Sequence, residues 1–76
     1  MERREVYVVY STRHRNYFGG VQFKLPLWVN KLNDSYWFLT KEKAESVIKE
    51  WELPHCEVQR KVAVYPDVTY PYIEND

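Results

Sequence analysis

Cys56, His14 and His55 are the side chains of this 76-residue chain best suited to nucleophilic or metal chemistry. Nucleophilic catalysis needs a thiol or hydroxyl beside a base that a third group orients. His55 and Cys56 are neighbours in a segment whose pattern predicts a strand, so their side chains should point to opposite faces. We therefore interpret Cys56 as a small core residue and expect no catalytic residues.

Other common reactive sites are missing as well. A single cysteine allows neither an intramolecular disulfide nor a multi-cysteine zinc site, and the two histidines lack the spacing of a paired metal motif. Gly19-Gly20 matches no phosphate-binding loop. Glu42 and Glu45 are paired carboxylates, but the solvent face of an amphipathic helix accounts for them. We expect no enzyme activity, no metal and no cofactor.

Cationic and stacking side chains occur together in one predicted loop. Arg13, His14, Arg15, Tyr17 and Phe18 are the combination that single-stranded nucleic acids exploit. Residues 1–31 carry six basic and two acidic side chains, or +4, and the chain is neutral, so residues 32–76 carry −4. A basic first half favours an anionic partner, although folding can bring the two halves together and cancel the field.

Aromatic residues make up 17 % of the chain, and we interpret most of them as core. A domain this small has little room to bury Trp28, Trp37 and Trp51 together, and an exposed tryptophan would be a protein-binding hot spot. Trp28 is therefore a candidate binding residue. Tyr70 and Tyr72, in a Tyr-Pro-Tyr-Ile stretch, either add to a partner's surface or pack back on the sheet.

The first half of the chain predicts a β-hairpin. Residues 5–11 form a nearly continuous β-branched and aromatic run, typical of a strand that is central or covered on both faces. Residues 11–20 are polar and then glycine-containing, with Gly19-Gly20 suited to a turn or a bulge. Val21, Phe23 and Leu25 alternate with polar residues and predict the return strand, which Pro26 marks as an edge strand or bends.

Two short stretches follow. Residues 27–29 continue that strand or begin another, and residues 36–39 fit either a strand or an extended lead-in to a helix.

A helix is the clearest predicted element. Thr40 is a suitable N-cap, and Ala44, Val47, Ile48 and Trp51 recur on one face at helical spacing. Leu53-Pro54 ends the helix, because the residue before proline avoids helical angles.

Residues 56–65 then alternate with a period of two, which predicts a half-buried strand. Cys56, Val58, Val62 and Val64 share its apolar face with Arg60. Arg60 either lies at the rim, pairs with a carboxylate, or is accommodated by a bulge.

These elements predict an α+β fold, a small antiparallel sheet of three to four strands with one helix packed on one face. Residues 1–65 should form a single domain, and residues 66–76, with two prolines and an acidic end, an extended and partly disordered C-terminal tail. The N-terminal apolar run is too short for a signal peptide, and no stretch approaches a membrane span. We expect a soluble, cytoplasmic protein with no membrane partner.

Several short motifs resemble those of small uncharacterised proteins from phages and prophages of Gram-positive bacteria. They are a Tyr-Val-Val-like first strand in Val6 to Tyr10, Tyr17-Phe18-Gly19-Gly20, Pro26-Leu27-Trp28-Val29, and a Phe-x-x-Lys-x-x-Ala pattern from Phe38 through Lys41 to Ala44. The resemblance covers roughly residues 5–58 and concerns packing motifs, whereas the final strand and tyrosine-rich tail depart from it.

The resemblance implies a phage accessory protein in the cytoplasm of a bacterial host, one that binds a host or bacterial protein. A stoichiometric inhibitor of an immunity protein, such as an anti-CRISPR protein, belongs to this class. Nucleic-acid mimicry over the whole surface would require an acidic chain, and this chain is neutral. The alternatives are a single-stranded nucleic-acid-binding module using the Arg13–Phe18 loop, and a homo-oligomer joined through an edge strand.

Overall fold

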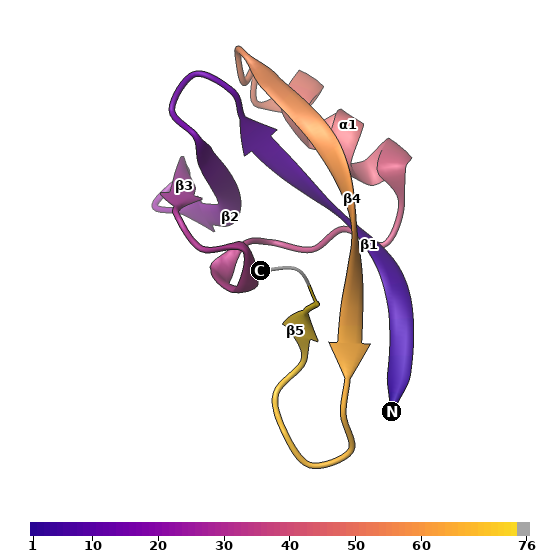
Figure 1. Ribbon diagram of the computed structural model, residues 1–76. Helices are drawn as coiled ribbons and strands as arrows, with labels where there is room; N and C mark the ends of the chain where they lie inside the picture. The colour runs from indigo at the N-terminus through magenta and orange to yellow at the C-terminus, as the bar shows by residue number, and fades with distance from the viewer. Residues whose placement is uncertain (75–76) are drawn as a thin grey trace.

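The protein is built on one curled antiparallel sheet with the strand order β3-β2-β1-β4-β5, shown in Figure 1. The computed structural model describes residues 1–74. The single α-helix contacts β1 and β4, so the predicted α+β class with one helix is confirmed, and the sheet has five strands where three to four were expected. The elements in chain order are β1 (Glu2–Ser11), β2 (Asn16–Gln22), β3 (Leu25–Val29), the short 3-10 helix η1 (Leu32–Asp34), α1 (Lys41–Glu50), β4 (Cys56–Tyr65) and β5 (Tyr72–Ile73).

The sheet curls because β1 keeps one neighbour along its length and leaves the other. β1 pairs with β4 from Glu2 to Ser11, but it pairs with β2 only at Tyr10 and Ser11. The segment that precedes the helix enters the resulting gap. Phe38 exchanges two backbone hydrogen bonds of 2.8 Å with Tyr7, and the Tyr36 N–H donates to the Phe18 carbonyl, also at 2.8 Å. Residues 36–39 are thus a lead-in to the helix that contains a single β-bridge.

The predicted β-hairpin is two hairpins in the structure: the chain turns first between Ser11 and Asn16, so β2 begins inside the predicted connection, and it turns again after Gln22. Gly20 has φ +110, and the pairing register shifts between Phe18 and Val21, so the two glycines form a bulge inside β2. The reversal falls on Phe23-Lys24, whose φ angles of 52 and 61 are those that a type I′ hairpin turn requires. The predicted strand over residues 21–25 is therefore wrong at its centre, because the bulge extends β2 and Phe23 lies in the turn.

The helix begins and ends as its sequence indicates. The Thr40 hydroxyl accepts a hydrogen bond of 3.2 Å from the Lys43 N–H, which confirms the predicted cap. At the other end Glu52 has φ 50, the Leu53 N–H donates to the Ile48 carbonyl, and the Glu52 N–H donates to Lys49. This pair of bonds is a Schellman motif, with glutamate in the left-handed position that usually carries glycine.

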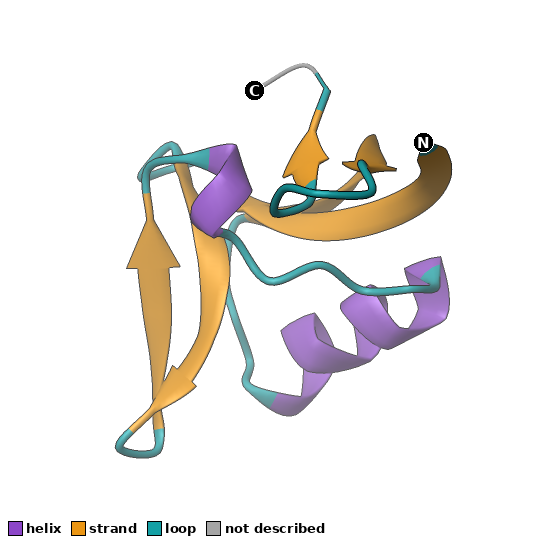
Figure 2. Ribbon diagram, turned by 90° about the horizontal axis from the view of Figure 1, so that it is seen from below, coloured by secondary structure: helices purple, strands orange, loops and turns teal. Residues whose placement is uncertain are grey.

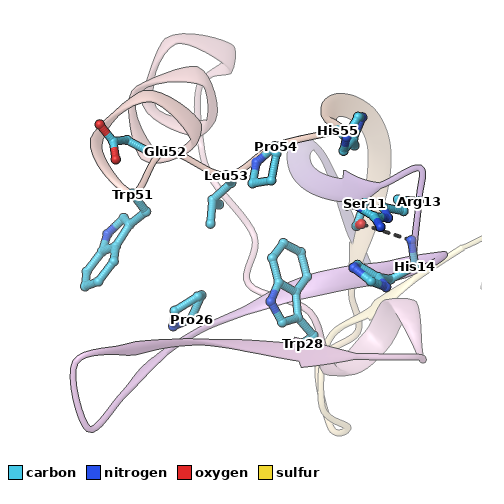
Figure 3. A pocket seen from close by; sticks show the side chains of 10 residues that line it. All are labelled: Ser11, Arg13, His14, Pro26, Trp28, Trp51, Glu52, Leu53, Pro54 and His55. Atoms are coloured by element: carbon cyan, nitrogen blue, oxygen red, sulfur yellow. Dashed lines mark hydrogen bonds between the residues drawn. The ribbon is translucent and has the colours of Figure 1, made fainter.

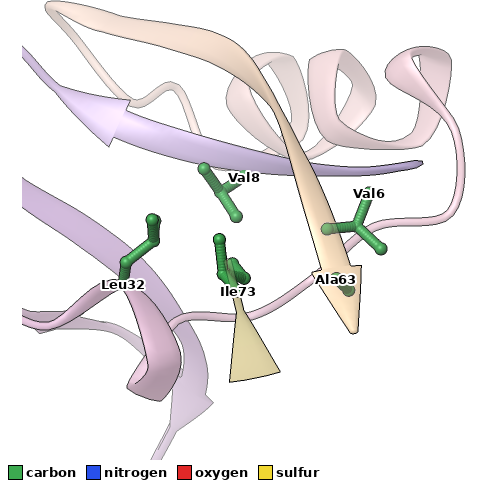
Figure 4. Close-up of a cluster of buried hydrophobic side chains, with 5 residues drawn as sticks. All are labelled: Val6, Val8, Leu32, Ala63 and Ile73. Carbon is green, nitrogen blue, oxygen red and sulfur yellow. The ribbon is translucent and has the colours of Figure 1, made fainter. Parts of the chain in front are cut away.

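From Val6 to Ser11, strand β1 is covered on both faces, as its apolar run predicts. Val9 faces the helix and belongs to a core cluster with Phe18, Phe38, Ala44 and Leu53. Val6 and Val8 alternate with it and lie in a second cluster on the opposite face, shown in Figure 4. Leu32, Ala63 and Ile73 complete that second cluster.

Strand β4 matches its predicted bounds, and the C-terminal segment is more regular than predicted. Arg60 is exposed and forms an ion pair with Glu5 at 2.8 Å, so both the rim position and the carboxylate partner are found, and the β1–β4 register runs through Arg60 without a bulge. Ile73 pairs with Ala63 and is 1 % exposed, so the expectation of an irregular tail is wrong for β5. The part of the tail prediction that concerns residues 75–76 falls outside the described range.

Candidate functional site

A cavity of about 310 Å³ lies where the β1–β2 turn, strand β3 and the end of α1 meet, and we call it the basic pocket. Figure 3 shows Trp28 extending from the hairpin and Trp51 from the helix end, with His14 and His55 on the side of the β1–β2 turn. The pocket is lined by Ser11, Arg13, His14, Pro26, Trp28, Trp51, Glu52, Leu53, Pro54 and His55.

Hydrogen bonds hold the rim of the basic pocket in place. The Thr12 N–H and hydroxyl both donate to the His55 carbonyl, at 2.8 and 2.9 Å. The His14 N–H donates to the buried Ser11 hydroxyl at 3.2 Å, and the Arg15 N–H donates to the Ser11 carbonyl at 2.8 Å. The β1–β2 turn is therefore fixed to the turn that precedes β4, and the side chains of both turns share one rim.

The lining of the basic pocket combines cationic groups with flat rings. Arg13, His14 and His55 are exposed, whereas Trp28 and Trp51 are half-buried and pack against the helix-side core. Glu52 is the single carboxylate among the lining residues. Within residues 1–74, Arg13 and Arg15 make no ion pair. This chemistry suits an anionic ligand that carries a planar apolar group.

A second hollow, of about 280 Å³, adjoins the basic pocket through Trp51. It is lined by Phe18, Gly20, Val21, Tyr36, Phe38, Val47 and Trp51. The Tyr36 and Phe38 rings lie 4.8 Å apart between centroids, and Phe38 stacks on Phe18 at 6.2 Å. This hollow offers apolar contact without a charged group.

The β2–β3 hairpin carries an exposed apolar surface, and in Figure 2 it forms one side of the molecule, with its turn directed away from the rest of the sheet. Phe23 is 88 % exposed, Leu25 67 %, Val21 47 % and Leu27 41 %. Val21 pairs with Pro26 and therefore lies on the other face of the hairpin from Leu25 and Leu27. We call Phe23, Leu25 and Leu27 the apolar hairpin surface. Lys24 lies among them and makes no ion pair within the part of the chain that the structure describes.

Another hollow, of about 560 Å³, is lined only by residues 67–70. Four consecutive residues enclose no converging groups from elsewhere in the fold, so this space is the inside of a loop and not a site. Tyr70 lies in it and is 92 % exposed, while Tyr72 on β5 is 41 % exposed.

The structure brings together part of the predicted set of binding residues. Arg13, His14 and Trp28 line the basic pocket, with Arg15 in the same turn. Tyr17 belongs to β2 and packs on the opposite core, with its ring 5.0 Å from that of Tyr10. Tyr70 and Tyr72 belong to the β4–β5 region and are not among the residues that line the basic pocket.

Sequence reasoning missed the pocket contributions of Trp51 and His55 and the exposed position of Phe23. Trp51 had a sufficient explanation as the last residue of the apolar helix stripe. His55 carried no pattern beyond its place beside Cys56. For Phe23, the strand-like alternation concealed a turn that lacks the usual Asn or Gly.

Cys56 has the environment of a structural cysteine. Burial raises the pKa of its thiol, and Sγ lies 3.4 Å from the Pro54 carbonyl oxygen. A raised pKa keeps the thiol protonated and weakly nucleophilic at neutral pH. Among residues 1–74, no three His, Cys, Asp or Glu side chains gather as metal ligands would. The same residues contain no helix with the length and apolar character needed to cross a membrane.

Comparisons with protein families, with curated proteins and with solved structures yield no match to this chain.

Proposed function

We propose that the protein is a phage-type accessory protein that binds a bacterial protein through the apolar hairpin surface and inhibits it stoichiometrically. The exposure of Phe23, Leu25 and Leu27 carries the proposal, because Leu25 and Leu27 share one face of β3 next to the turn that holds Phe23, and exposed apolar surfaces are typical of protein-binding sites. The phage setting rests on the motif resemblance described above. A target in bacterial immunity, such as a CRISPR nuclease, fits that setting.

The charge of the hairpin specifies the kind of partner surface. From Val6 to Asn33 the chain has no Asp or Glu, and it contains four cations, Arg13, Arg15, Lys24 and Lys31. Lys24 lies in the turn itself, beside Phe23. The complementary surface is therefore an apolar depression bordered by carboxylates, which would receive Phe23 and Leu25 and pair with Lys24.

Docking through side chains fits the hairpin better than strand addition does. β3 is an edge strand, and a partner strand would need its backbone N–H groups. Pro26, the second residue of this short strand, has no N–H to donate. The same proline disfavours homo-oligomers that pair β3 with β3.

The test of binding uses the immobilised protein, a lysate of bacterial host cells, and identification of the retained proteins by mass spectrometry. The candidate partner is then purified and its affinity measured for the wild type, Leu25→Ser, and the control Val68→Ser. Val68 is 92 % exposed but lies far along the chain in the 67–70 loop. Leu25→Ser should weaken binding at least about tenfold, and Val68→Ser less than about twofold.

Two outcomes would contradict the proposal. One is the failure to recover any partner under repeated conditions, and the other is equal weakening by Leu25→Ser and Val68→Ser. Inhibition is tested separately, by measuring the activity of the purified partner with excess protein. Unchanged activity at saturation would remove the inhibitor function while leaving the binding site intact.

A further inference from the structure

We propose that the basic pocket binds one unpaired nucleotide of a single-stranded nucleic acid, with the base against Trp28 and Trp51 and a phosphate against Arg13 and His14. This inference goes beyond the proposed function, because it concerns a different surface and a different class of ligand. It also differs from the single-strand hypothesis drawn from the sequence, which relied on Tyr17 and Phe18 for stacking. Phe18 is 3 % exposed, and Tyr17 packs on the opposite core.

The size of the pocket fits one nucleotide unit. A volume of about 310 Å³ lies at the lower end of the range for small-ligand sites, roughly 300–1,000 Å³. A base with its sugar fills such a volume, whereas a duplex would have to remain outside it. Trp28 and Trp51 are half-buried, so each indole is fixed by the core and still presents part of its surface to the cavity. Rings of this kind stack on any base, which favours sequence-tolerant binding.

The charges at the pocket match a phosphate on the same ligand. Arg13 is exposed and has no carboxylate partner among residues 1–74, so its guanidinium is available for a bidentate phosphate contact. His14 and His55 provide further N–H donors on the same rim. Glu52 alone opposes an anion. An acidic peptide would use the cations but would leave the two indoles without a planar partner, so the lining favours a nucleotide.

The pocket is also organised before any ligand binds. The two hydrogen bonds from Thr12 to His55 fix the rim, and the Schellman turn fixes Trp51 and Glu52 at the helix end. Binding therefore orders few additional groups, which lowers its entropic cost.

The experiment measures fluorescence anisotropy of labelled ten-nucleotide oligo-dT and oligo-rU with the wild-type protein and three variants. Arg13→Ala should weaken binding at least about fivefold, and Glu52→Gln should tighten it about twofold by removing the opposing carboxylate. Lys43→Ala is the matched control, because Lys43 is an exposed cation in the first turn of α1. Its effect should stay below about twofold.

Salt dependence and tryptophan fluorescence locate the bound strand. One phosphate contact predicts about a 2.6-fold loss of affinity between about 50 and 200 mM salt. Stacking on Trp28 and Trp51 should quench the intrinsic fluorescence in step with the anisotropy change. Circular dichroism melting of each variant confirms that it is folded.

Four results would overturn the inference. They are no anisotropy change at about 50 mM salt, equal weakening by Lys43→Ala and Arg13→Ala, binding without quenching, and competition by inorganic phosphate or oligo-glutamate as effective as that by unlabelled oligo-dT. Leu25→Ser, which tests the hairpin surface, should leave oligonucleotide binding unchanged. The failure of either proposal is therefore distinguishable from failure of the other.

Discussion

Substitutions in the Phe23-Lys24 turn should raise the stability of the fold, and removal of the Phe23 side chain should at the same time weaken partner binding. Both residues have left-handed φ angles, 52 and 61, without being glycine. Such a conformation costs a non-glycine residue roughly 1–2 kcal/mol, and glycine in its place loses about 0.5–1 kcal/mol to the greater freedom of the unfolded chain. Lys24→Gly should therefore stabilise the fold by about 0.5–1 kcal/mol, a rise in Tm of roughly 2–8 °C.

Phe23→Asn separates the two properties. Asparagine tolerates the left-handed region, so the variant should also be more stable, by a similar amount. The substitution removes a side chain that is 88 % exposed and that we place at the centre of the partner contact. Loss of a hot-spot ring of about 2 kcal/mol would weaken partner binding about 30-fold. Lys24→Gly keeps the ring and should retain most of the binding.

Thermal and urea unfolding, monitored by circular dichroism, give the stability changes. The affinity of each variant is measured against the purified partner. Val68→Asn is the control, because it removes an equally exposed apolar side chain at a position without positive φ. Its stability should change by less than about 0.5 kcal/mol. A lower Tm for Lys24→Gly would refute the argument from backbone strain. A stabilised Phe23→Asn that binds as tightly as the wild type would remove Phe23 from the contact.

Three further predictions concern the framework. Gly20→Ala should destabilise the fold by about 1–3 kcal/mol, because a residue with a Cβ rarely adopts a φ of +110. The nearest atom to the added Cβ is 3.7 Å away, so the cost comes from the backbone and not from a clash. An unchanged Tm would contradict the need for glycine. Ile73→Ala should cost about 2–5 kcal/mol, and a value near zero by urea unfolding would mean that β5 does not close the second core. For Cys56, burial raises the pKa of the thiol, so the folded protein keeps the thiol proton at pH values at which the unfolded chain has already lost it. The resulting stability is present below the ordinary value of 9.0 and falls as pH rises above it, and Cys56→Ala should flatten this part of the urea-unfolding profile.

The helix and β4 could be predicted because their determinants are local. The Thr40 cap, the apolar stripe that begins at Ala44 and the stop at Leu53-Pro54 all lie within the helix or next to it. The β4 sequence alternates with a period of two except at Arg60, and the bounds of the strand follow from that pattern. Arg60 is exposed and pairs with Glu5 across the sheet, a contact that the local pattern does not specify.

The hairpin and β5 could not be predicted because their determinants are not local. Gly19-Gly20 fits a turn as well as a bulge, and the choice depends on Tyr36, which bonds to Phe18 from a distant part of the chain. β5 is short and stands next to Pro71, so its sequence resembles a loop, and it is a strand because Ile73 fills the second core. The basic pocket needs Trp28 and Trp51 from separate elements, and no spacing rule connects them.

Backbone strain in this protein is confined to the two surfaces to which we assign binding. Five non-glycine residues have positive φ among residues 1–74, namely Arg15, Phe23, Lys24, Glu52 and His55. Phe23 and Lys24 form the tip of the apolar hairpin surface, Glu52 and His55 line the basic pocket, and Arg15 ends the turn that carries Arg13 and His14. Each conformation costs free energy that glycine or asparagine at the same position would reduce. At Phe23 a stabilising substitution should also reduce binding, because the ring enters the partner contact, whereas Lys24→Gly keeps that ring and loss of the Glu52 carboxylate removes a charge that opposes an anion.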